Sequence, residues 1–184
     1  MSQLKKVTAK KAADITQHYE MGEEAAPHLE KDISPFNFVK ALLNAELYSE
    51  AVNFLAHALP KRESVWWACQ SAKTDTSEKA NTDALLAAEA WVRAPKEELR
   101  KNCMDIAEKD KLKSSASWAA LAAYWSSGSI ADDSVAQIPP PPFQYALAVS
   151  GAVNLAAAAQ ESVDVAFKEL IKQGIDIANG GGGK

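Results

Sequence analysis

The chain lacks the motifs on which common enzymatic chemistry depends. It contains neither CxxC nor HExxH, the spacings that hold zinc, and its glycine cluster lies at the end of the chain rather than in a phosphate-binding turn. It also has no GxSxG sequence, in which a serine nucleophile sits on a tight turn. The histidines, His18, His28 and His57, are far apart, and none stands at metal-ligand spacing from a cysteine or glutamate. We therefore expect no catalytic residues, no cofactor and no metal site.

Long apolar runs and clustered charge of one sign are absent too. No segment is apolar over the roughly 20 residues that span a bilayer, and no apolar run follows the N-terminal lysines as in a signal peptide. The net charge is −4 with both signs scattered, whereas nucleic-acid binding needs clustered lysine and arginine. These absences predict a cytoplasmic protein without membrane insertion and without a nucleic-acid partner. Cys69 and Cys103, on separate predicted helices, should then be reduced core residues.

No stretch alternates apolar and polar residues with period two, so we predict no β-sheet. Apolar residues recur instead with helical spacing between helix-breaking residues. Ser34 and Pro35 form the clearest helix start, an N-cap followed by proline at the first helical position, and Pro60 separates two further helices. Because short loops favour antiparallel packing of consecutive helices, the pattern predicts an all-α, single-domain helical bundle or short α-solenoid of about seven helices.

The predicted organisation has three parts. Residues 1–33 are expected to be a partly ordered N-terminal segment with a polar helix over residues 8–21, residues 34–179 the helical domain, and residues 180–184 a flexible Gly-rich tail. Within the domain, residues 74–77 form a polar loop. Residues 129–142 form the longest connection, whose four final prolines predict a stiff polyproline II strut.

The last two helices should be the most apolar. Phe143 begins a nearly all-apolar helix that we expect to be central, because its small residues Ala148, Gly151 and Ala152 let neighbouring helices approach closely. The final helix should bury a stripe that consists of Val163, Phe167, Leu170, Ile171 and Ala178.

The most unusual segment is residues 54–69, in which two predicted helices meet and two adjacent tryptophans follow a charged cluster. Adjacent helical residues point about 100° apart, so Trp66 and Trp67 cannot face the same way. Trp66 borders the apolar face of its helix and should be buried. Trp67 lies on the polar side of the helix with Glu63 and Gln70, and the sequence leaves open whether it is exposed.

Trp67 has three interpretations that the sequence leaves open. An exposed tryptophan beside arginine is typical of a protein-binding hot spot, and this predicts a partner-binding face formed by Lys61, Arg62, Glu63 and Trp67. Alternatively, Trp67 packs internally against a neighbouring helix or the proline strut, or it lines a ligand pocket. A nucleophile pair of His57 and Cys69 would require the two side chains to meet; a hydrogen-bonded His57 at its helix end is the simpler interpretation.

The same segment, residues 54–63 (FLAHALPKRE) followed by residues 65–69 (VWWAC), resembles a functionally uncharacterised bacterial family of about this length. Residues 88–92 (AEAWV), 118–122 (WAALA) and 139–143 (PPPPF) fit the same family, so the resemblance covers residues 12–179. The family offers no catalytic residues. Its members accompany type VI secretion genes, and the resemblance therefore implies an accessory or cargo-adaptor role.

Two functions are consistent with these features. The first is a non-enzymatic protein-interaction module, an adaptor or chaperone-like accessory factor whose partner is another protein, such as type VI secretion cargo. The second is a small-molecule-binding helical protein or degenerate enzyme with a pocket lined by Trp66, Trp91, Trp118 and Trp125. Tryptophans at helical spacing are more often plain core, which favours the first function.

Overall fold

The computed structural model describes residues 3–75, 81–131 and 134–183, and within these ranges every regular element is a helix. The elements in chain order are α1 (Ala13–Thr16), the 3-10 helix η1 (Ala26–His28), α2 (Pro35–Asn44), α3 (Tyr48–Ala58), α4 (Lys61–Ala72), α5 (Thr82–Arg93), α6 (Glu97–Lys109), α7 (Ser115–Tyr124), α8 (Gln144–Ala158) and α9 (Val163–Ala178). The predicted all-α, single-domain fold is confirmed, with nine α-helices in the described part against about seven predicted. Residues 76 and 77 of the predicted polar loop, residues 132 and 133 of the predicted long connection and Lys184 of the predicted tail lie outside the described residues.

Side-chain caps explain where several helices begin. The Ser34 hydroxyl accepts a hydrogen bond from the Asn37 N–H (3.3 Å), as predicted for this N-cap, and Pro35 is the first residue of α2. The side chain of Asn81 caps α5 in the same way, and Ser114 caps α7. Each cap satisfies a backbone donor that the first helical turn leaves without an intrahelical partner.

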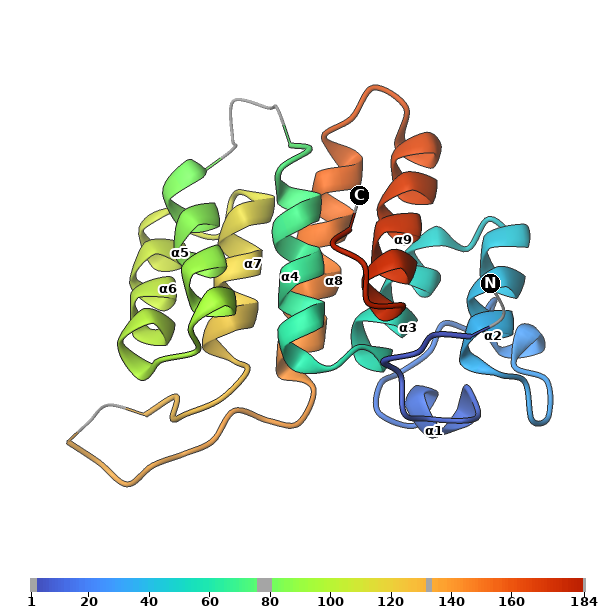
Figure 1. Ribbon diagram of the computed structural model, residues 1–184, viewed down its shortest axis with the longest axis horizontal. Coiled ribbons are helices and arrows are strands. Elements are labelled where there is room, and N and C mark those ends of the chain that lie inside the picture. The colour runs from blue at the N-terminus through green and yellow to red at the C-terminus, as the bar shows by residue number, and fades with distance from the viewer. Residues whose placement is uncertain (1–2, 76–80, 132–133, 184) are drawn as a thin grey trace.

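The chain crosses the molecule from one end to the other and then returns (Figure 1). Helices α5, α6 and α7 lie at one end, α4 and α8 run through the middle, and α1, α2, α3 and α9 lie towards the other end. Helix α8 packs against α3, α4, α7 and α9, so the nearly all-apolar helix is central as predicted. A Cβ at Gly151 would stand 2.8 Å from the Trp118 ring, which shows why a small residue is needed where α7 meets α8.

The N-terminal segment differs from its prediction. Only Ala13–Thr16 is α-helical within the predicted helix of residues 8–21. The segment instead packs on the bundle through Leu4 and Ile15, which are buried, and the Lys6 N–H donates to the Ala178 carbonyl at the end of α9 (2.8 Å). A short polar helix is not stable by itself. The backbone of this segment therefore forms hydrogen bonds with the domain in place of intrahelical ones.

The glycines after α9 cap the helix rather than trail from it. Gly180, at φ +95°, donates to the Ile177 carbonyl (3.0 Å), and Gly181 donates to the Asp176 carbonyl (2.9 Å). These two bonds form a Schellman motif, in which glycine adopts the left-handed conformation at low cost. The predicted flexible tail is thus seated on α9 as far as Gly183. Within α9, Val163 is exposed, contrary to prediction, whereas the other four residues of the predicted stripe are buried.

Candidate interaction surface

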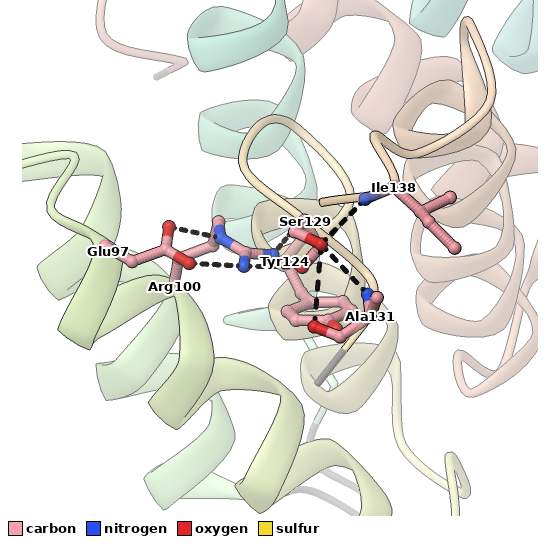
Figure 2. Close-up of polar contacts among 6 residues, drawn as sticks. All are labelled: Glu97, Arg100, Tyr124, Ser129, Ala131 and Ile138. Carbon is pink, nitrogen blue, oxygen red and sulfur yellow. Dashed lines mark hydrogen bonds and ion pairs between the residues drawn. The ribbon is translucent and has the colours of Figure 1, made fainter. Parts of the chain in front are cut away.

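Residues 126–143, here called the arm, connect α7 to α8 and extend away from the bundle (Figure 1). Backbone and hydroxyl bonds close the base of the arm. The Ile130 N–H donates to the Ile138 carbonyl (2.8 Å), and the Ser129 hydroxyl accepts from the N–H groups of Ala131 (3.1 Å) and Ile138 (3.0 Å). Figure 2 shows Ser129 at the centre of these bonds. The two sides of the arm are therefore held together where they leave the bundle.

Arg100 of α6 attaches the arm to the bundle. Its side chain is 1% exposed, and its guanidinium donates to the carbonyls of Tyr124 and Ser129, at 2.8 Å each (Figure 2). It also donates to both carboxylate oxygens of Glu97, at 2.6 and 2.7 Å, and lies 4.4 Å from the centre of the Tyr124 ring. The hydrogen bonds to Glu97 raise the pKa of Arg100 above its usual value. A planar fork of five N–H groups can serve these acceptors together, which a lysine ammonium cannot.

Gly128 makes room for this arrangement. The residue has φ +71°, and a Cβ there would stand 2.5 Å from Arg100 Nε and 2.8 Å from a Glu97 carboxylate oxygen. Only glycine therefore combines this backbone conformation with the close passage of the chain over the guanidinium.

The far end of the arm is held by an aromatic stack. Phe143, at φ +61°, lies in a turn closed by a bond from the Gln144 N–H to the Pro141 carbonyl (3.2 Å). Its ring stacks on His18 with 4.2 Å between centroids, and its centroid lies 5.8 Å from that of His57. A bulky residue in the left-handed region costs about 1–2 kcal/mol, so these ring contacts offset a local strain.

The arm carries exposed aliphatic side chains between these two attachments. Ile130 is 41% exposed, Val135 58% and Ile138 53%. Single exposed aliphatic residues are common on protein surfaces, but this one short connection, whose ends are fixed, carries three of them. In chemical terms, the arm offers exposed aliphatic side chains and backbone carbonyls, and its sequence contains two aspartates, Asp132 and Asp133, but no lysine, arginine or histidine.

The residues predicted to form a partner-binding face are Lys61, Arg62, Glu63 and Trp67. The three charged residues bind other segments of this chain. The Lys61 ammonium donates to the Ser126 carbonyl at the start of the arm (2.9 Å). Arg62 donates to the Val92 and Arg93 carbonyls at the end of α5 (2.6 and 3.3 Å), and Glu63 pairs with Lys6 (3.0 Å). These side chains connect the first turn of α4 to three neighbouring segments.

Of the two adjacent tryptophans, Trp67 is the more deeply buried, whereas the sequence predicts a buried Trp66. Trp67 is fully buried, and its indole N–H donates to the Leu170 carbonyl of α9 (2.8 Å). Trp66 is half-buried, and its indole N–H donates to the Gly182 carbonyl (3.1 Å). Trp67 is buried because α9 packs on the side of α4 that looks polar in the sequence; Ser71, on that side, is fully buried as well. Of the interpretations left open, packing against a neighbouring helix is the correct one.

The other tryptophans are distributed through the structure. Trp91 is buried in the core, and the Trp118 indole N–H donates to the Leu112 carbonyl (3.0 Å). Trp66 lines a cavity of about 230 Å³ with Arg62 and Val92 among its neighbours, and Trp91, Trp118 and Trp125 are not part of its lining. The cavity is thus not the predicted pocket of four tryptophans.

The groups considered for nucleophilic chemistry are occupied or buried. His57 is buried, its Nδ1 lies 2.8 Å from the Asn53 carbonyl, and burial lowers its pKa. Cys69 and Cys103 are both buried free thiols, and burial raises the pKa of each, that of Cys103 to about 12. A thiol with a raised pKa holds little of the reactive thiolate at neutral pH.

Within residues 3–75, 81–131 and 134–183, no three His, Cys, Asp or Glu side chains come together as metal ligands. No helix in the described part of the chain has the length and hydropathy needed to cross a membrane.

Sequence reasoning missed Arg100, the residue that holds the arm. In the sequence it is one more charged residue on an amphipathic helix, three positions after a glutamate. The available signals are this Glu97–Arg100 spacing, which brings the two side chains to one helix face, and a lone Gly128 at the start of a long connection. Neither signal shows that the carbonyls of Tyr124 and Ser129 would converge on the guanidinium.

Fold and surface together define an all-helical protein with a long, doubly attached connection that carries its exposed aliphatic residues into solvent. The chain belongs to the family of unknown function DUF6931, whose sequence profile matches residues 38–178. This agrees with the resemblance to a functionally uncharacterised family. No curated protein and no solved structure matches the chain significantly.

Proposed function

We propose that the protein is a non-enzymatic interaction module, an adaptor or chaperone-like accessory factor, that presents its arm to a partner protein. The observation that supports this proposal is the exposure of Ile130, Val135 and Ile138 on a connection whose two ends are both fixed to the bundle. Exposed aliphatic side chains favour contact with a complementary surface because the contact removes them from water.

The attachment of the arm also favours binding. A loop that must order when it binds loses affinity, because immobilising each flexible side chain and backbone segment costs free energy. In this protein, Arg100 and Ser129 fix the base of the arm in the absence of any partner. The free energy needed to order the arm is therefore already spent when the protein folds. Binding does not have to supply it again, so the contacts with the partner contribute more fully to affinity.

The class of partner follows from the family resemblance described above. Members that accompany type VI secretion genes would use such a surface to hold a secretion cargo or a component of the apparatus, and this adaptor would work in the cytoplasm. The secretion partner and the cytoplasmic location are both part of the proposal, and the experiment below tests them together with it.

The experiment compares two variants with matched exposure. Ile130→Ser combined with Val135→Ser changes the arm, and Leu86→Ser combined with Val165→Ser changes residues that are 54% and 59% exposed elsewhere. Each tagged protein is used to isolate partners from native lysate. We expect the parent and the control to retain one stoichiometric protein and the arm variant to lose it, with unchanged thermal unfolding in all three. Equal recovery by the arm variant would refute the proposal.

A further inference from the structure

The four prolines of the arm differ in burial. Pro139, Pro141 and Pro142 are exposed, whereas Pro140 and Phe143 are half-buried. Consecutive prolines adopt the polyproline II conformation because the ring fixes φ and each proline keeps the residue before it extended. Phe143, at φ +61°, lies in the turn that follows, so this helix ends at Pro142; with three residues per turn, Pro140 marks the face turned towards the bundle. The two remaining faces, Ile138 with Pro141 and Pro139 with Pro142, both point to solvent.

This ridge, defined as residues 138–142, is clamped at both ends. The Ile138 N–H donates to the Ser129 hydroxyl (3.0 Å), and the Ile138 carbonyl accepts from the Ile130 N–H (2.8 Å). At the other end, the Pro141 carbonyl accepts from the Gln144 N–H, and the Phe143 ring stacks on His18. The extended conformation is therefore imposed by the fold as well as by the prolines themselves.

The chemistry of the ridge defines what can bind it. Within the described part of the chain, the carbonyls of Pro139, Pro140 and Pro142 accept no hydrogen bond, and proline has no N–H to satisfy. The sequence of the arm contains two aspartates and no basic residue, so it does not favour an acidic partner surface. A complementary site needs flat aromatic side chains that pack between the proline rings, and indole or phenol groups that donate to the carbonyls.

We propose that the two exposed faces of residues 138–142 dock into an aromatic-lined groove on a partner domain that binds polyproline II segments. Domains of this kind pack two faces of a preformed polyproline helix against aromatic side chains, and the third face is left over. In this protein the third face is the one already held by the bundle. The inference rests on the proposed function and names the part of the arm that the partner contacts.

The test uses isolated, isotope-labelled SH3, WW and EVH1 domains as probes, each titrated with the intact protein and followed through the indole resonances of its groove. We expect at least one probe to show saturable shifts at concentrations below about 1 mM, the weak limit of specific binding. Replacing both Pro139 and Pro142 by alanine should weaken that binding by about tenfold, which corresponds to 1.4 kcal/mol.

Two controls separate loss of the ridge from loss of the fold. Pro140→Ala removes a proline from the same run but on the bundle-facing side, and Pro95→Ala removes an exposed proline elsewhere. Both should bind within about threefold of the parent, less than the tenfold step of 1.4 kcal/mol. All variants should keep the thermal midpoint and helical circular dichroism of the parent.

Two results would overturn the inference: no saturable shift with any of the three domains, or equal affinity of the double variant and the parent. Failure here is distinguishable from failure of the proposed function, because the partner isolation depends on Ile130 and Val135, which lie outside the ridge. A partner that is lost with those two residues but retained by the Pro139 and Pro142 variant would support the arm and exclude the ridge.

Discussion

Replacing Arg100 by methionine would test how far the arm depends on its attachment. Methionine fills much of the same space but has no N–H donors. The change removes the donor from the Tyr124 and Ser129 carbonyls and takes a cation away from the Tyr124 ring. Glu97 loses its ion pair as well, but its side chain is 54% exposed, so water solvates the carboxylate.

The size of the change in unfolding free energy depends on which of the lost interactions water can replace. The ion pair with Glu97 contributes at most about 1 kcal/mol, because pairs with an exposed partner are weak. Each of the two carbonyls loses a hydrogen bond to a charged donor, worth about 1.5–3 kcal/mol. Release of the arm lets water reach both carbonyls and recovers part of this loss. We therefore expect Arg100→Met to lower the free energy of unfolding by about 2–4 kcal/mol.

Urea denaturation measures this loss, and limited proteolysis of the native protein measures release of the arm. Cleavage within residues 126–143 should be much faster in Arg100→Met than in the parent, because opening of the arm no longer breaks the bonds to the guanidinium. Glu97→Gln is the matched control and should stay within about 1 kcal/mol of the parent. An Arg100→Met protein as stable as the parent, with an arm that is equally resistant to protease, would refute this account of the attachment.

Three further predictions concern the core, the arm and the thiols. Trp67→Ala should lower the free energy of unfolding by about 3–5 kcal/mol and the half-buried Trp66→Ala by about 1–2 kcal/mol, so equal losses in denaturant would contradict the assignment. Gly128→Ala should cost about 2 kcal/mol by thermal unfolding, since a Cβ meets Arg100 at a positive φ; an unchanged midpoint would show that the loop adapts. Cys69 and Cys103 should react with a thiol reagent only as fast as the protein unfolds, and immediate labelling at about pH 8 would exclude their burial.

Much of the fold was predictable because local signals and packing agree. Ser34 with Pro35 starts α2 where an N-cap and an N1 proline predict it, and the nearly all-apolar run after Phe143 becomes the central helix α8. The predicted helix over residues 8–21 is the exception. Its polar residues offer no stripe wide enough to hold a helix on the bundle, and backbone bonds such as that from Lys6 to Ala178 decide its course instead.

The surface was harder to predict for a physical reason. Periodicity assigns one buried face to each helix, but α4 packs against α5, α7, α8 and α9 and therefore has little exposed face. Ser71 is buried along with Trp67, although it is polar. Periodicity also gives the wrong place for Arg100, because it assigns a charged residue to the exposed face of its helix. Arg100 is buried instead, where backbone carbonyls from a distant loop converge on it. Such convergence depends on tertiary structure and leaves no local pattern.

The two attachments of the arm also determine how binding and stability are connected. Arg100 belongs to α6 at one end of the molecule, and His18, which stacks on Phe143, follows α1 near the other end (Figure 1). A partner that recognises only the fixed arm stabilises the folded protein through linkage, by about 2.7 kcal/mol at a concentration of 100 times its Kd. Because the coupled equilibria are reciprocal, loosening either attachment must weaken partner binding. The loss of binding free energy equals the free energy needed to order the arm again. Residues that hold the arm without touching the partner, such as Arg100 and His18, are therefore as important to the proposed interaction as the side chains that touch it.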